Sequence, residues 1–368
     1  MSQTSPDAAA PPRPAAPPPP KPFFMKQPVM WRMVYALVPV LVAGIYFFGW
    51  RVLTLAAVCA AVGVATEYLT SRKRGQPVSA ACLVTCGLYV LSLPSEMPFW
   101  MAAVGIIVGI LFGKEFFGGF GRNFANPAIV GRAFVYVCFP VEMTGQFAPT
   151  FQGWPGGFAE WSFSRLSELP PYLASAGGTV IDAISAATPL VARRDFGYEA
   201  PLGNLFLGNI SGTFKDAFAA HVLDAGSIGE VSAAVILVSA VYLLITKTAN
   251  WRLMLSPLAG AAAAALLFRH LAGDAAVPGL AFTLASGGLA YAAVFMVTEP
   301  ISGPKRPLAM YVYGAFIGFM IVLLRWKGQF AGAVGFAILL GNIVGPVLDI
   351  GAKAWEEKRK AAGAKEEQ

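Results

Sequence analysis

The chain alternates between long apolar runs and short polar interruptions, and one long polar segment, at about residues 142–229, divides it in the middle. Most of the apolar runs are close to the roughly 17–20 residues that a helix needs to cross the hydrocarbon core of a bilayer. The pattern predicts an all-α polytopic membrane protein with about ten transmembrane helices. The expected spans are residues 33–49, 52–70, 78–93, 98–112, 126–141, 230–246, 253–271, 279–298, 308–324 and 329–350.

The same pattern divides the chain into parts with different expected roles. The N-terminus is rich in proline and alanine, which is typical of a disordered or polyproline-like tail and not of a cleavable signal peptide. The expected parts are a Pro-rich N-terminus at 1–30, a first five-helix half at 31–141, an outward-facing segment at 142–229, a second five-helix half at 230–350 and a charged tail at 351–368.

The composition supports a membrane protein and excludes several other classes. Hydrophobic residues make up 56% of the chain and charged residues only 13%, against about 25% charged in a soluble domain. The net charge of +7 would suit nucleic acid, but in a membrane protein such an excess marks cytoplasmic loops, so no nucleic-acid partner is expected. The two histidines are far apart and the four cysteines lie in apolar runs, so no metal site is expected.

The basic residues predict the orientation of the chain in the membrane. Ten spans would place one set of them on a single side, which should be the cytoplasm. This set is Lys21, Lys26, Arg32, Arg72, Lys73, Arg74, Lys114, Arg122, Lys247, Arg252, Lys305, Arg306, Lys353, Lys358, Arg359 and Lys360. Both termini are then cytoplasmic, and the polar segment at 142–229 faces outward.

An odd number of spans in each half implies that the second half begins on the opposite side of the membrane. This is the arrangement of an inverted-topology repeat, two five-helix halves related by a pseudo-two-fold axis. The third span of each half ends in a similar proline-containing phrase, at 93–98 and at 299–304. Interrupted segments in matching positions indicate a ligand site between the halves. A chance likeness between two proline-containing loops is the alternative.

A glycine-rich run at 113–127 interrupts the first half. Irregular backbone at membrane depth is tolerated only where it is buried in protein or lines a cavity. Gly118 and Gly119 would let a flat ring approach the backbone closely. The residues that would supply polar groups to an aromatic or charged ligand are Lys114, Glu115, Arg122, Asn123 and Asn126. The alternative is a plain cytoplasmic turn.

The outward segment contains the short run DAISAATPL at 182–190, which suggests covalent chemistry. Thr188 follows two alanines and precedes Pro189, so its hydroxyl would be accessible on a stiffened backbone. The alternative is that Ser185 and Thr188 only cap a short helix or turn. Later in the chain, Ser227 and Glu230 have the spacing of a capping box, which we interpret as structural. Glu299, near the membrane, is a functional candidate or an interfacial residue.

Four of these phrases together resemble one known family. GKEFFGGFGRNFANPAIVGRAF, at 113–134, closely resembles a signature of the membrane subunits NqrB and RnfD. These are subunits of the sodium-pumping NADH:quinone oxidoreductase and of the Rnf ferredoxin:NAD oxidoreductase. DAISAATPL is similar to the flavinylation motif of that family, and GSIGEVS and FMVTEPISGP are similar to further family phrases. The resemblance extends over about residues 31–350 and implies ten spans in two inverted halves.

The resemblance also implies cofactors and partners. Thr188 matches the threonine that holds FMN through a phosphoester bond installed by a flavin transferase on the outer face. Asp182 and Ser185 match the other polar positions of that motif, whereas Ala186 stands where the family usually has glycine. A non-covalent riboflavin inside the helical bundle is implied as well. For NqrB the resemblance further implies a quinone site near the glycine-rich run. The expected cofactor-binding residues of that run are Gly118, Gly119, Asn123 and Asn126.

The function that follows is electron transfer through the bacterial inner membrane, coupled to sodium or proton movement. The chain would work with the other subunits of an Rnf or Nqr complex, including a flavoprotein subunit on the outer, periplasmic face, where Thr188 also lies. No side chain is needed as a catalytic acid or base, because the flavin carries the redox chemistry. The short Pro-rich N-terminus favours an RnfD-type subunit over NqrB. A flavin-free secondary transporter with inverted repeats is the alternative from another class.

Overall fold

The computed structural model describes residues 22–163, 186–215, 220–273, 277–328, 330 and 332–366, and helices dominate it. Apolar segments occur at all ten predicted positions. In the first half they are α1 (Pro28–Phe48), α2 (Arg51–Lys73), α3 (Ala81–Leu91), α4 (Phe99–Gly113) and α5 (Pro127–Cys138). In the second half they are α10 (Ala233–Ile245), α11 (Trp251–Ala272), the broken segment α12 (Leu280–Ala285), α13 (Leu289–Tyr291) and η4 (Ala292–Met296), then α14 (Pro307–Trp326) and α15 (Ala333–Glu366).

Helix length agrees with an all-α polytopic membrane protein. Within the described residues, six helices are long and apolar enough to cross a membrane, namely α1, α2, α4, α11, α14 and α15. The shorter apolar helices are α3, α5 and α10. The predicted fold class is therefore confirmed.

Local sequence explains where several of these helices begin. Proline occupies the first turn of α1, α5 and α14, where its missing N–H removes no intrahelical bond. Asn126 caps α5 by accepting a hydrogen bond from the amide of Ala128 at 3.0 Å. Asn250 caps α11 in the same way, accepting from the amide of Arg252 at 3.0 Å.

The two halves repeat the same pattern of helix packing. The second helix packs against the fourth, and the fourth against the fifth, in both halves: α2 with α4 and α4 with α5, then α11 with α14 and α14 with α15. Glycine allows the close approach in each half. A Cβ at Gly109 of α4 would lie 2.5 Å from the carbonyl oxygen of Pro127, and one at Gly260 of α11 would lie 2.6 Å from the Cα of Ala315. Such small-residue contacts are typical of helix pairs in membranes.

The third segment differs between the halves. In the first half α3 is one continuous helix, whereas in the second half the chain between 280 and 296 forms α12, a turn, α13 and the π-helical η4. The turn contains Gly287 and Gly288, whose φ angles are +67° and +72° and favour glycine. The expected span at 279–298 is thus broken in its middle. π-Helical turns of this kind are frequent at functional sites.

The connecting loops fall at two opposite ends of the bundle. At one end the amide of Met25 donates to the carbonyl of Val78 at 2.8 Å, and Arg74 pairs with Glu115. At the other end the amide of Trp50 donates to the carbonyl of Glu160 at 3.1 Å. The predicted basic loops gather at the first of these ends, as the alternation of spans requires. Which end faces the cytoplasm stays a prediction.

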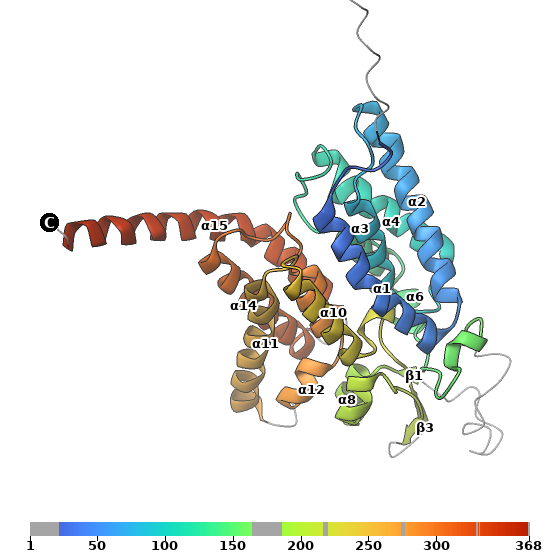
Figure 1. The fold of residues 1–368 in the computed structure, drawn as a ribbon. Coiled ribbons are helices and arrows are strands. Elements are labelled where there is room, and N and C mark those ends of the chain that lie inside the picture. The colour runs from blue at the N-terminus through green and yellow to red at the C-terminus, as the bar shows by residue number, and fades with distance from the viewer. Residues whose placement is uncertain are drawn as a thin grey trace, which may run out of the picture.

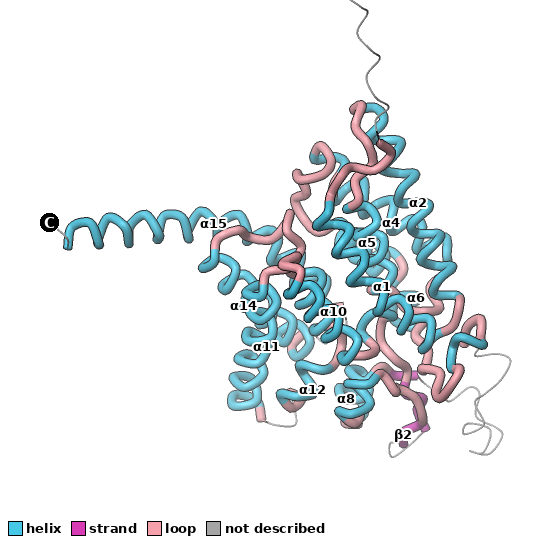
Figure 2. Tube along the Cα trace, in the orientation of Figure 1, coloured by secondary structure: helices cyan, strands magenta, loops and turns pink. Residues whose placement is uncertain are grey.

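The segment between the halves contributes short helices and a small sheet that the sequence did not predict. Its described elements are α6 (Pro140–Gly145), η2 (Gly156–Ala159), β1 (Ala186–Ala187), α8 (Pro189–Phe196), α9 (Leu202–Leu207), β2 (Thr213–Lys215), β3 (Ala220–Leu223) and η3 (Ile228–Glu230). The strand order is β1-β3-β2. β1 runs parallel to β3, with Ala187 opposite Leu223, and β2 runs antiparallel to β3. Figure 2 shows the strands at the end of the bundle where α8 also lies.

In Figure 1 the first half, from blue to teal, lies beside the second half, from yellow to red, with α8 and the strands below both. α15 leaves the bundle and runs far to one side, so that the helix continues from the last span into the charged tail. Arg306, which precedes α14, pairs with Glu356 of this extension. The fold thus places the segment that contains Thr188 at one end of the boundary between the two halves.

Candidate functional site

Thr188 lies between β1 and α8, and both elements fix its backbone. The amide of Asp224 donates to the carbonyl of Ala187 at 3.1 Å, which anchors β1 directly before it. Thr188 is the N-cap residue of α8, and its carbonyl accepts from the amide of Ala192 at 2.8 Å. Its side chain, however, makes no capping hydrogen bond. Thr188 therefore occupies the N-cap position of α8, but its hydroxyl does not cap the helix.

The other two residues predicted from the same motif, Asp182 and Ser185, lie outside the described residues. Their expected roles beside Thr188 stay predictions.

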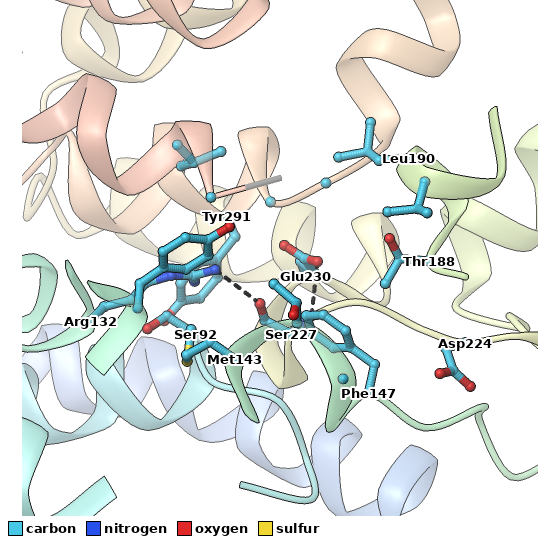
Figure 3. Close-up of a pocket in the computed structure, with 18 of the residues that line it drawn as sticks. Ser92, Arg132, Met143, Phe147, Thr188, Leu190, Asp224, Ser227, Glu230 and Tyr291 are labelled. Carbon is cyan, nitrogen blue, oxygen red and sulfur yellow. Dashed lines mark hydrogen bonds between the residues drawn. The ribbon is translucent and has the colours of Figure 1, made fainter. Parts of the chain in front are cut away.

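Thr188 lines a cavity of about 530 Å³ between the two halves, which we call the Thr188 cavity. This volume is in the range of small-molecule and cofactor pockets, about 300–1,000 Å³. The residues that line it include Arg132, Tyr136, Thr188, Leu190, Arg194, Asp224, Ser227, Glu230, Gly287, Gly288, Tyr291 and Met296. They come from α5, α8, η3 and the broken segment of the second half, so the cavity needs both halves to exist (Figure 3).

The broken segment forms one wall of the Thr188 cavity. Gly288 passes so close to Glu230 that a Cβ there would collide with the carboxylate. Behind this turn the guanidinium of Arg325 donates to the carbonyls of Ser286, at 3.4 Å, and Gly287. The hydroxyl of Tyr291 donates to the carbonyl of Leu88 at 3.3 Å, which joins this wall to α3 of the first half.

Arg132 and Glu230 bring opposite charges to the same cavity. Glu230 completes a capping box with Ser227, whose amide donates to its Oε1 at 2.8 Å. The predicted capping pair is confirmed, although it caps the short η3 and α10 starts later, at Ala233. Burial raises the pKa of the Glu230 carboxyl above its usual value, and the neighbouring Arg132 guanidinium opposes that shift. Figure 3 shows Thr188 and Arg132 on opposite sides of Glu230.

The glycine-rich run lies at the other end of the bundle, where Lys114 and Glu115 are paired and Arg122 is exposed. The buried ammonium of Lys114 donates to Glu67 Oε2 at 2.5 Å and to Ser79 Oγ at 2.6 Å. Arg74 pairs with Glu115. The cavity that touches Lys114 has only about 20 Å³, room for roughly one water molecule. The described geometry is that of a hydrogen-bonded turn.

Three of the remaining residues predicted in this run have identifiable local roles, whereas Asn123 lines a cavity of about 360 Å³. Gly118 and Gly119 have φ angles of +104° and +92°, so the turn itself requires glycine there. Asn126 caps α5 and also donates from its amide group to the carbonyl of Met296 at 3.5 Å. Since Met296 lines the Thr188 cavity, the run and the cavity share the η4 segment. Participation of these residues in ligand binding stays a prediction.

Glu299 lies next to this run, at the end of η4. Burial raises the pKa of its carboxyl to about 7, while hydrogen bonds from the side chains of Ser302 and Asn123 act in the opposite direction. The residue is only 9% exposed, so most of its side chain is covered by the rest of the chain. The interpretation of Glu299 as a functional candidate is the one that its burial favours.

The profile of the family described as "NQR2, RnfD, RnfE family" matches residues 24–354, nearly the whole described chain. The chain belongs to this family. The resemblance that the four sequence phrases indicated is thereby confirmed.

Curated relatives of the NQR2, RnfD, RnfE family agree with this match, and each is the B component of a Na(+)-translocating NADH-quinone reductase. The relative from Pseudomonas aeruginosa is 33% identical over 293 residues, which cover 78% of this chain and 63% of that protein. The relative from Azotobacter vinelandii is 33% identical over 303 residues, 81% of this chain and 66% of that protein. The relative from Chlamydia abortus is 32% identical over 363 aligned residues, 78% and 72% respectively. The aligned part thus spans less than two thirds of the Pseudomonas relative.

The sequence interpretation missed Arg132, which lines the Thr188 cavity. Arg132 lies within the predicted fifth span, in a stretch that is otherwise apolar. A charged residue inside a transmembrane segment is expensive and usually faces a cavity or the bundle interior. That signal alone would have made Arg132 a candidate site residue. The role of Tyr291 had no such signal, because an aromatic residue in an apolar run is ordinary.

Proposed function

We propose that this chain is a membrane subunit of an ion-translocating oxidoreductase of the Nqr or Rnf type, coupled to Na⁺ or H⁺ movement. Electrons would pass through an FMN joined to Thr188 by a phosphoester and through a second, non-covalent flavin, riboflavin. The observation that carries this proposal is the position of Thr188 at a cavity built by both halves of the chain. Family membership and the printed names of the relatives support it.

The residues present fit a flavin. The Thr188 cavity is large enough for a cofactor, and the Thr188 hydroxyl is not used to cap α8. Tyr136 and Tyr291 provide aromatic surface, and Arg132, which also lines the cavity, provides N–H donors. When bound, the flavin would supply the redox chemistry. The chain would attach it through Thr188, orient it between the halves and limit the access of water.

The second flavin would lie between the halves, and the η4 segment offers a connection toward the other end of the bundle. Met296 lines the Thr188 cavity, while its carbonyl accepts a hydrogen bond from Asn126 of the glycine-rich run. In an NADH:quinone type of complex, a quinone would react near that run. In a ferredoxin:NAD type of complex, electrons would pass along the same path to or from another subunit. The RnfD type and the NqrB type are retained as alternatives.

Partners follow from the proposed path. A flavoprotein subunit would exchange electrons with the FMN on Thr188 at the periplasmic face of the inner membrane, and a flavin transferase would install that FMN. The gathering of the basic loops at the end opposite to Thr188 supports this orientation.

The test is the chemistry of one oxygen atom. The full chain is co-expressed with a flavin transferase, purified and denatured, and in-gel flavin fluorescence is recorded. Thr188→Ala should abolish the fluorescence and remove the mass of one FMN from the peptide containing residue 188, because no hydroxyl remains to carry the phosphoester. Ser185→Ala keeps that hydroxyl and serves as the matched control, which should remain fluorescent.

Two outcomes would contradict the proposal in different ways. Fluorescence that persists in Thr188→Ala would move the attachment to another residue, with Ser185 the first to test. Wild-type protein that contains neither covalent nor bound flavin would favour the secondary transporter, because two inverted halves around a cavity also suit that class.

A further inference from the structure

Arg132 is a half-buried cation whose hydrogen-bonding capacity is largely unused. It lies on α5 and lines the Thr188 cavity. Within the described residues, its guanidinium makes one hydrogen bond, at 3.5 Å to the hydroxyl of Ser227. A guanidinium carries five N–H donors in a planar fork. The remaining donors have no hydrogen-bond partner among the described residues, at a residue that lines the cavity.

The nearby carboxylate does not neutralise this cation by direct contact. Among the described residues, no carboxylate oxygen lies within 4.0 Å of the Arg132 guanidinium nitrogens. The Glu230 carboxylate accepts from the amide of Ser227 and feels the charges of both Arg132 and Arg325. Two arginines and one glutamate sum to one positive charge. A net charge that is partly shielded from water favours a group of opposite charge beside it.

Other charged groups of the cavity do not supply that compensation at the same place. Arg194 forms an ion pair with its neighbour Asp195 at 2.5 Å. Asp224 lies on the Thr188 side of Glu230, away from Arg132 (Figure 3). The end of the cavity beside Arg132 and Tyr291 therefore suits an electron-rich, planar ligand whose hydrogen-bond acceptors lie along one edge.

We propose that Arg132 binds the acceptor edge of the flavin ring carried by Thr188 and raises its reduction potential. This inference rests on the proposed function and names the residue that sets the reduction potential of the covalent flavin. Reduction by two electrons from the outer-face flavoprotein, with uptake of one proton, leaves one negative charge on the ring. A fixed guanidinium at that edge stabilises the reduced form more than the oxidised form. Arg132 is a positioning residue with an electrostatic effect, and no proton transfer is assigned to it.

The experiment is a reductive titration of the purified, flavinylated protein, followed by flavin absorbance. The couple that belongs to the covalent flavin is identified by its absence in Thr188→Ala. Arg132→Met should make reduction of that couple about tenfold less favourable, which is about 30 mV for two electrons. Arg132→Lys keeps the charge without the planar fork and should recover part of the shift. Arg193→Met is the matched control, since Arg193 is on α8 but pairs with Glu199 at 3.7 Å outside the cavity.

A second variant keeps the test decisive if Arg132→Met does not fold. The double variant Arg132→Gln with Glu230→Gln leaves no uncompensated carboxylate and is compared with Glu230→Gln alone, relative to which the same downward shift is expected. An unchanged covalent couple in a folded, flavinylated variant overturns the inference, and so does a shift confined to the non-covalent couple. If wild-type protein carries no covalent flavin, the proposed function fails together with the inference. If it carries the flavin and only the shift is missing, the inference alone fails.

Discussion

The buried ion pair between Lys114 and Glu67 gives a sharp prediction about stability. The two side chains are 2% and 3% exposed, and their charged atoms are 2.5 Å apart. Glu67 also accepts from the amide of Ser79 at 2.8 Å, and Lys114 donates to the Ser79 hydroxyl. Lys114→Met would leave the Glu67 carboxylate buried with only the Ser79 amide as a partner.

The expected magnitude follows from this burial. Removing one partner of a buried pair usually costs about 3–5 kcal/mol, because an uncompensated charge remains. Replacing both partners by uncharged groups of similar volume is often close to neutral. Lys114→Met should therefore lower the free energy of unfolding by about 3–5 kcal/mol, and the double variant with Glu67→Gln should recover most of that loss.

The assay is denaturant unfolding of the purified protein in detergent, followed by tryptophan fluorescence. Lys353→Met is the control, because Lys353 and its partner Glu357 are 62% and 66% exposed and 3.9 Å apart. An exposed pair of this kind contributes no more than about 0.5 kcal/mol. The reasoning would be refuted if Lys114→Met were as stable as Lys353→Met, or if the double variant lost the sum of the two single losses.

Two further predictions concern orientation and pH. Near Gly157, a cysteine at the 85% exposed position of Trp154 should react with an impermeant thiol reagent in intact cells, and one at the exposed position of Lys73, near Gly75, should not, since the two positions lie at opposite ends of the bundle. The reverse pattern would contradict the outward position of Thr188. The pKa of Glu299 rises from 4.5 to about 7 on burial, so the folded state favours the protonated carboxyl and loses stability as the pH rises from about 4.5 through 7. Glu299→Gln should then be more stable than wild type at pH 8, by up to about 3 kcal/mol, and should show little gain at pH 4.5. Equal gains at both pH values in denaturant titrations would exclude this explanation.

The features that the sequence predicts well are those set by local composition. Apolar runs located all ten segments, because the length of a run decides whether a helix can cross the bilayer. Ser227 and Glu230 were recognisable as a capping box since the two residues are three apart. The break at Gly287 and Gly288 was visible as a pair of glycines but was placed inside a continuous span. The fifth helix was expected to reach 141 and ends at Cys138, where Pro140 starts α6.

The contacts that build the site were beyond sequence reasoning because they join distant segments. Lys114 was expected to offer its charge to a ligand, yet it meets Glu67, which lies in another helix. Thr188 was located by its motif, but the cavity beside it depends on α5 and on the broken segment of the second half. Arg132 carries a local signal, a charge in an apolar run, but the residues that build the cavity with it come from distant segments.

The parallel pairing of β1 with β3 has a consequence for biosynthesis. β1 ends at Ala187, and its partner Leu223 belongs to a strand that is synthesised later. Until β3 has emerged and docked, the Ala187 carbonyl lacks the amide of Asp224, and the backbone before Thr188 lacks its anchor. A flavin transferase of the kind proposed would therefore meet Thr188 in two forms, an open chain early and a hydrogen-bonded turn later. The order of two events, the pairing of β1 with β3 and the proposed attachment of FMN, would then decide which of these two forms the enzyme recognises.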